Sequence, residues 1–296
     1  MTRPRLMVCL PFQASGDPMA WGGPAALGIW STAVEELGFD GIAVTDHPFP
    51  ATAWLDGGHH ALDPFVALTV MAAATRRVRL VTDVLVAGYR NPYLLAKMVA
   101  SLDVVSAGRL CVGIGAGYQR DEFTALGAQF DGRGRVFDAM LDATFAALTG
   151  QPVVDHDGPF PAAGNLLRPL PVQQPRPPFW IGGNSDAALR RAVTRADGWM
   201  PFPQPRSRVA TSLSPPLGSL DALAERIAQA RAWRSAEGRA PLEFCSGLFG
   251  RVDDAEMPGE LEDYGQAGVT WVRILAPGMR MRDSILRLEQ MAAVLG

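Results

Sequence analysis

The segment Ile-Gly-Gly-Asn-Ser at residues 181–185 carries the clearest chemical signal in the sequence. It follows a short apolar run and precedes a helical pattern. Backbone N–H groups at a helix start bind phosphate, and paired glycines let an anion approach because no Cβ atom blocks it. We therefore predict a phosphate site at Gly182, Gly183, Asn184 and Ser185. The alternative is a plain strand-to-helix loop in which Asn184 or Ser185 only caps the helix.

Asp46 and His47 form a second chemical group, directly after the apolar run Gly41–Thr45. A histidine beside a ligand can act as general acid or base, because the charge of imidazole changes near neutral pH. In the alternative interpretation, Asp46 caps the following loop and His47 only packs under Pro48 and Phe49. The residues alone leave both interpretations open.

The neighbouring histidines His59 and His60, with Asp56 close by, suggest a metal site at first sight. Adjacent histidines in a strand or turn usually diverge, and a metal needs three or four converging ligands. Beyond His47 and His156 the sequence has no further histidine to complete a set. We therefore predict that the protein holds no metal.

Short apolar runs alternate with amphipathic helical stretches along the whole chain, as a parallel sheet requires. The expected strands are residues 6–12, 41–45, 78–83, 110–114, 178–182, 198–202, 242–247 and 270–275. The expected helices are residues 23–37, 64–74, 92–105, 133–148, 186–195, 219–237, 259–267 and 283–295. This repeat predicts a (β/α)8 barrel that forms a single domain over residues 1–296.

Two longer excursions interrupt the repeat, a hairpin loop expected at residues 149–177 and a proline-rich loop at residues 203–218. We expect both as insertions at the carboxyl-terminal face of the barrel, where the loops after the strands hold the active site. The expected strand ends are Phe12, residues 45–47, Thr82 and Asp83, residues 115–118, residues 182–184, and Pro201 and Phe202.

Three alternating glycines, Gly113, Gly115 and Gly117, close the expected fourth strand, where a flat ring could lie against bare backbone. They do not match the dinucleotide fingerprint, because the third spacing is wrong and no helix starts at once. Beside them, Tyr118 could contact a ligand or simply pack at the rim. Trp54 is the tryptophan best placed to line a substrate pocket.

Several of these segments together resemble the bacterial luciferase-like flavin and deazaflavin oxidoreductases, above all the branch that uses coenzyme F420. The resemblance runs in order from about residue 5 to residue 200 and is thin beyond. It is carried by residues 36–47, 89–97, 102–110, 113–117 with Glu122 and Phe123, and 180–185 with 196–199. It implies a (β/α)8 barrel that catalyses hydride transfer with a deazaflavin or, alternatively, monooxygenation with reduced FMN and oxygen.

The resemblance also implies roles for particular residues. His47 would face the reactive carbon of the cofactor ring, and Asp46 would contact the ring or the ribityl edge. Thr82 and Asp83 fall where the family has a bulge, with a strained or cis peptide, behind the ring; Asp83 departs from the small residue, commonly glycine, that is usual there. Arg133 and Arg135 match a basic pair of the family, or else pair with Asp131 or Asp138 at the surface. The resulting candidate site has His47 and Asp46 as catalytic residues, Thr82, Asp83, Gly115, Ala116, Gly117, Tyr118, Gly182, Gly183, Asn184 and Ser185 at the cofactor, and Phe12 and Trp54 at the substrate.

Composition limits the partners. The net charge of -3 and the pI near 5.8 give no electrostatic footprint for nucleic acid or an anionic membrane, which favours a small-molecule substrate. Three cysteines without metal-ligand spacing predict buried thiols in a reducing cytoplasm. Relatives often pair their barrels, so a homodimer is expected. The alternatives of another class are a metal-assisted hydrolase that uses His47, His59, His60 and Asp83, and a non-catalytic flavin-binding barrel.

Overall fold

The computed structural model describes residues 3–11, 21, 23–55, 60–209, 213–250, 252–278 and 280–295. Its central element is a closed barrel of eight strands in the order β1-β10-β9-β8-β7-β4-β3-β2, and all neighbours pair in parallel. The barrel strands are β1 (Arg5–Cys9), β2 (Gly41–Val44), β3 (Arg79–Val86), β4 (Leu110–Gly115), β7 (Phe179–Gly182), β8 (Gly198–Met200), β9 (Glu243–Gly247) and β10 (Trp271–Leu275). The expected (β/α)8 barrel is confirmed.

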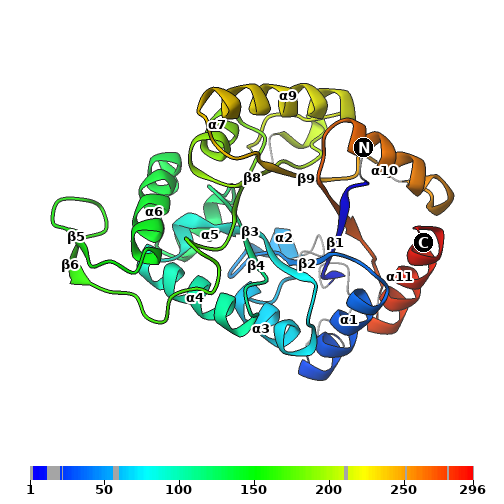
Figure 1. Cartoon of the computed structure of the whole chain (residues 1–296), viewed down its shortest axis with the longest axis horizontal. Coiled ribbons are helices and arrows are strands. Elements are labelled where there is room, and N and C mark those ends of the chain that lie inside the picture. The colour runs from blue at the N-terminus through cyan, green and yellow to red at the C-terminus, as the bar shows by residue number, and fades with distance from the viewer. Residues whose placement is uncertain are drawn as a thin grey trace.

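A ring of helices surrounds the strands (Figure 1). They are α1 (Pro24–Glu36), α3 (Pro64–Ala74), α4 (Pro92–Val105), α6 (Arg133–Leu148), α7 (Asp186–Arg195), α9 (Leu220–Ala236), α10 (Met257–Gln266) and α11 (Met281–Leu295). Each overlaps one expected helix. Local sequence explains several starts: the side chains of Asp63 and Asn91 cap α3 and α4, and a proline follows each cap. Within the described ranges, no helix is long and apolar enough to cross a membrane.

The first long excursion forms an antiparallel hairpin of β5 (Val153–Asp155) and β6 (Ala162–Asn165), which projects outside the barrel (Figure 1). The hairpin is confirmed, but its expected place at the carboxyl-terminal face is wrong. It joins the end of α6 to the start of β7, and Gln173 behind it bonds Leu110 and Arg79, where β4 and β3 begin. A helix-to-strand connection in a barrel lies at the opposite end from the active site.

The second excursion does follow a strand, β8, and therefore lies at the mouth. Backbone pairing of Gln204 with Leu217 closes its base, and a short turn η4 (Arg206–Arg208) follows. Two short helices after other strands, α2 (Thr52–Leu55) and α5 (Arg120–Ala125), were not expected from the sequence. Two further short turns are η3 (Ala87–Tyr89) and η5 (Asp254–Glu256).

The described residues form three core clusters. The largest fills the space between strands and helices, and the smallest consists of Val86, Phe123 and Phe130. The third fills the barrel itself with Met7, Cys9, Ala43, Val81, Cys111, Trp180, Met200, Cys245 and Trp271. All three cysteines are therefore inside the barrel and unoxidised, as expected. Burial raises the pKa of each of these thiols, so they stay protonated.

Strand β3 contains an irregularity that shapes the mouth. Its pairing with β4 shifts between Thr82 and Leu85, and the Asp83–Val84 peptide bond is cis. The expectation that the strand ends at Asp83 is wrong, since pairing resumes after the bulge and continues to Val86. Asp83 thus occupies the bulge position itself.

The bulge explains the glycines on the neighbouring strands. A Cβ atom added to Gly113, Gly115 or Gly182 would lie 3.2, 3.3 or 3.1 Å from the side chain of Val84. On these faces the glycines therefore make room for Val84. The expected flat ring against Gly113, Gly115 and Gly117 would therefore meet side chains as well as bare backbone, since Val84 lies beside the first two glycines and Val86 and Phe123 lie beside Gly117.

Candidate active site

His47 lies just beyond β2, at the mouth of the barrel, with 14% of its side chain exposed. Its Nδ1 atom is 3.0 Å from the side-chain Nε2 of Gln119 and 3.4 Å from Oε2 of Glu122. Protonated Nδ1 donates to Glu122, whereas unprotonated Nδ1 accepts from Gln119. The Nε2 atom of His47 has no hydrogen-bond partner among the described residues. The histidine therefore has one nitrogen held by the protein in either protonation state.

Glu122 is fully buried on α5 and accepts hydrogen bonds from three different groups. The Phe49 N–H lies 2.9 Å from Oε1, and the Tyr89 hydroxyl lies 2.9 Å from Oε2, which also faces His47. Burial raises the pKa of Glu122, but the hydrogen bonds from His47, Phe49 and Tyr89 together outweigh it and hold that pKa below its usual range. An ionised carboxylate therefore stands behind the imidazole.

Acid should weaken the fold through Glu122. Because its pKa is lower in the folded than in the unfolded chain, where it is about 4.3, its stabilisation is complete above that value and is lost as the pH falls through the folded pKa. We expect the difference in unfolding free energy between the wild type and Glu122→Gln to shrink as the pH falls from about 6 to about 3, roughly the range in which carboxylates titrate. Urea unfolding at several pH values measures this, and a constant difference would contradict it.

Asp46, the residue before the histidine, is buried and paired. Its two oxygens accept from Arg90 at 2.6 and 2.8 Å, and the Val86 N–H donates to one of them at 3.0 Å. These bonds join the end of β2 to the end of β3 and so fix the backbone that carries His47. A contact of Asp46 with a cofactor stays a prediction, and the structure gives its carboxylate a positioning role.

Two predicted aromatic residues lie beside the histidine. The ring centroids of His47 and Trp54 are 5.3 Å apart, and those of Trp54 and Tyr118 are 5.8 Å apart. A cavity of about 200 Å³ opens next to them, lined by Trp54, Tyr118, Gln119, Arg120 and Asp121. Burial and the charge of Glu122 raise the pKa of Tyr118 to about 12, so its hydroxyl stays neutral. Phe12 lies outside the described residues.

Thr82 and Asp83 are both engaged inside the barrel. The Thr82 hydroxyl donates to the Gly113 carbonyl at 2.8 Å. Asp83 accepts from Arg273 of β10 at 2.5 Å and from the Cys9 thiol at 3.4 Å. Asp83 is only 9% exposed, so it is a buried residue of the barrel and not a solvated turn residue.

The predicted phosphate loop adopts a backbone that suits glycine, since Gly183 has a φ of 113°. Ser185 caps α7, and its side chain accepts from the Ala188 N–H at 3.1 Å. Asn184 does not cap the helix. Its amide instead bonds the Phe202 N–H and carbonyl at 3.0 and 2.9 Å and the Pro215 carbonyl at 3.1 Å.

Replacing Asn184 with alanine should destabilise the protein by about 1–3 kcal/mol, because the buried amide makes three hydrogen bonds, and the partly buried backbone groups of Phe202 and Pro215 would lose their partner. Ser185→Ala, a cap removal, should cost about 1 kcal/mol. Chemical denaturation of both variants measures the difference. Equal stabilities of Asn184→Ala and the wild type would show that the amide does not hold this loop.

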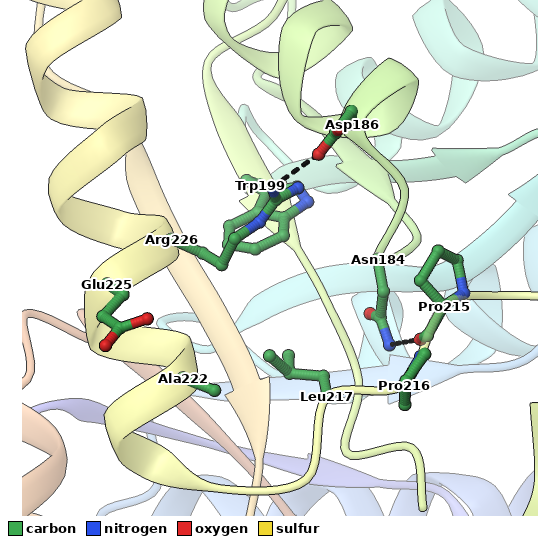
Figure 2. Close-up of a pocket in the computed structure, with 9 residues that line it drawn as sticks. All are labelled: Asn184, Asp186, Trp199, Pro215, Pro216, Leu217, Ala222, Glu225 and Arg226. Carbon is green, nitrogen blue, oxygen red and sulfur yellow. Dashed lines mark hydrogen bonds and ion pairs between the residues drawn. The ribbon is translucent and has the colours of Figure 1, made fainter. Parts of the chain in front are cut away.

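Figure 2 shows a second cavity beside this loop, between the first turns of α7 and α9. It has a volume of about 330 Å³ and is lined by Asn184, Asp186, Trp199, Pro215, Pro216, Leu217, Ala222, Glu225 and Arg226. Arg226 reaches across it to Asp186 at 2.5 Å, which neutralises one acidic group at the start of α7.

Arg133 and Arg135, the expected basic pair, do not form the surface ion pairs of the alternative interpretation. Asp131 pairs with Arg120, and Asp138 pairs with Arg191, so neither holds Arg133 or Arg135. The side chain of Arg133 instead donates to the Gly117 carbonyl at 2.9 Å and stacks on Phe130. In the part of the chain that the structure describes, no three histidine, cysteine or acidic side chains converge on a metal-sized space. His59, one of the proposed metal ligands, lies outside that part.

The sequence did not predict a role at the site for Gln119, Tyr89 or Arg273. Glu122 was named only as part of the family resemblance, without a role. Glu122 lies next to the apolar Phe123 in a short segment just after β4, and both residues are buried. A carboxylate is rarely buried without a partner, so its position beside an apolar residue was the available signal. Its partner His47 is 75 residues away, and Asp83 is 190 residues from Arg273, so no local pattern shows either pair.

Comparisons with known proteins agree with this architecture. Residues 5–256 match the family of luciferase-like monooxygenases. An uncharacterized protein of Mycobacterium tuberculosis is 30% identical over 253 residues, which cover 84% of this chain and 82% of that protein. The crystal structure of the monooxygenase RslO1 from Streptomyces bottropensis aligns over 98% of both chains with a TM-score of 0.79 at 22% identity. An F420-dependent secondary alcohol dehydrogenase aligns over 100% of both chains with a TM-score of 0.75 at 15% identity.

The family match spans most of the chain and includes every strand from β1 to β9, together with His47, Glu122 and the loop after β7. The barrel order and the side chains gathered at its mouth are consistent with that match. The chain therefore belongs to the luciferase-like monooxygenase family and is an oxidoreductase of that family.

Proposed function

We propose that this protein is an F420-dependent oxidoreductase that transfers a hydride between the deazaflavin and a small organic substrate. The observation that carries the proposal is the pairing of His47 with buried Glu122 beside Trp54 and Tyr118 at the barrel mouth. A histidine held in this way can exchange a proton with a substrate oxygen while a neighbouring group exchanges the hydride.

The residues present fit a ring with a phosphate-bearing tail. Gly183, with its φ of 113°, leaves bare backbone beside the start of α7, and Ser185 caps only the Ala188 N–H, so other first-turn N–H groups of that helix could bind a phosphate. The bulge at Asp83 and Val84 would back the ring, with Ala116 and Tyr118 at its edge. When bound, the deazaflavin supplies the hydride chemistry, and the protein supplies placement and electrostatics.

The proton chemistry belongs to His47 and Glu122. Protonated Nδ1 of His47 can donate to Oε2 of Glu122, 3.4 Å away, so the histidine can hold the proton that accompanies the hydride. Gln119 offers a donor to Nδ1 when that proton has left. The bonds of Asp46 to Arg90 and Val86 keep the histidine backbone in place through both states.

Titration of the purified protein with F420 and with FMN, separately and followed by fluorescence, tests the proposal. We expect F420 to bind more tightly and the reduced cofactor to be oxidised by a carbonyl substrate from a panel of ketones and aldehydes. Tight FMN binding with oxygen consumption by the reduced form would replace the proposal with the FMN-dependent monooxygenase. Binding of F420 without turnover against carbonyl, alkene and alcohol panels would favour a non-catalytic carrier.

A further inference from the structure

Asp83 and Arg273 form a charged pair inside the barrel. They come from β3 and β10, which β2 and β1 separate in the barrel wall, so the pair spans the interior. The contact joins Arg273 Nη1 to Asp83 Oδ1 at 2.5 Å, and the other Asp83 oxygen accepts from Cys9. Proteins bury such a pair only when its atoms are well satisfied.

Asp83 is satisfied, but Arg273 is not. Its Nε and Nη2 atoms have no hydrogen bond to any described residue, although a guanidinium presents five N–H donors. The side chain is 20% exposed, whereas that of Asp83 is 5% exposed. The unused donors therefore belong to the more accessible partner.

Gly247 lies beside those donors and places no side chain against them. A Cβ atom added to Gly247 would lie 3.4 Å from Arg273 Nη2 and 3.7 Å from Nε, so the guanidinium lies against bare backbone at the end of β9. Pro203, at the start of the loop after β8, would be 3.4 Å from the same Cβ atom. Arg273 thus lies where the strands end and the mouth begins.

The charges around Arg273 favour a neutral ligand over an anion. The carboxylate of Asp83 already neutralises Arg273, and the nearby thiols of Cys9 and Cys245 are neutral because burial raises their pKa. An added carboxylate would leave a net negative charge in the barrel, whereas a neutral carbonyl oxygen would not. A carbonyl oxygen can accept from Nε and Nη2 without that cost.

We propose that Arg273 is a ligand-binding residue of the mouth whose free donors bind a carbonyl oxygen. The proposal rests on the proposed function, because the oxygen belongs either to a ring carbonyl of the cofactor or to a carbonyl substrate. Asp83 is the positioning residue that aims the guanidinium, which explains why an acidic residue occupies the bulge.

Two variants test this without leaving a buried carboxylate unpaired. Asp83→Asn keeps the guanidinium, and Asp83→Asn/Arg273→Met removes it. Thermal unfolding of both variants tests whether they are folded. Dissociation constants for F420 and FMN are measured by fluorescence quenching. Binding of acetone, cyclohexanone and acetate is measured by ligand-observed NMR, with and without cofactor. Arg5→Met, which removes an arginine at the opposite end of the barrel, is the matched control.

If the ring supplies the oxygen, the cofactor dissociation constant should rise roughly 10- to 100-fold from the single to the double variant. If the substrate supplies it, cofactor affinity stays equal and ketone binding falls by the same factor. Equal affinities for both, or a site that binds acetate and not ketones, would overturn the proposal. A wild type that binds neither cofactor would overturn the proposed function instead, and ketone binding to the unloaded proteins would still decide the role of Arg273.

Discussion

Replacing His47 with glutamine should lower kcat roughly 10²- to 10⁴-fold, the range that general acid–base catalysis contributes. Glutamine keeps much of the size and one hydrogen-bonding end, so Gln119 and Glu122 retain a partner. The affinity for the cofactor should change little, because in the proposed mechanism the histidine would exchange a proton and would not anchor the ribityl phosphate. Steady-state kinetics with reduced F420, together with cofactor titration, separates the two effects.

His156→Gln is the matched control, because that histidine lies between β5 and β6 on the hairpin outside the barrel. Its activity should equal that of the wild type. A His47→Gln protein with wild-type kcat would remove the histidine from the mechanism and leave it a packing residue against Trp54.

The barrel was predictable because its signals are local. A strand such as β4 shows as a continuous apolar run, and a helix such as α4 shows by its Asn91 cap and the proline that follows. Each such element can be found within a few residues of sequence. Since eight repeats of strand and helix have one common way to close, element order was sufficient to predict the architecture.

The pairs at the mouth were not predictable in the same way. The contact of His47 with Glu122 and that of Asp83 with Arg273 depend on which strands become neighbours and on how far each side chain reaches. The resemblance to a family located His47 and the bulge. It could not foresee Arg273, because it is thin beyond residue 200, where β9 and β10 lie.

The glycines show how one residue can be explained in two ways. Gly113 and Gly115 were singled out because bare backbone accepts a flat ring. The structure shows bare backbone that accepts Val84 from the bulge on the neighbouring strand. A glycine in a strand indicates close approach of something, and the sequence does not say whether that is a ligand or another part of the chain.

Gly113→Ala should be the most damaging of the glycine-to-alanine substitutions along these strands, because backbone as well as Val84 lies beside Gly113. The added Cβ would lie 2.1 Å from the Thr82 carbonyl oxygen, a backbone atom, as well as 3.1 Å from Met200 Sδ. Since β3 and β4 pair on both sides of this point, neither strand can move without losing hydrogen bonds. We expect a loss of about 3 kcal/mol or more, at the upper end of overpacking effects, measured by urea unfolding.

Two further variants test whether steric overlap causes such losses of stability. Gly259→Ala lies in α10 with nothing within 4 Å of the new atom, so it should stabilise the protein by about 0.5–1 kcal/mol. At Gly182 the new Cβ would meet only the Val84 side chain, at 3.1 Å. The loss in Gly182→Ala should therefore be largely recovered in Gly182→Ala/Val84→Ala. If the second substitution gives no recovery, Val84 is not what these glycines accommodate, and the space would again be open to a ligand.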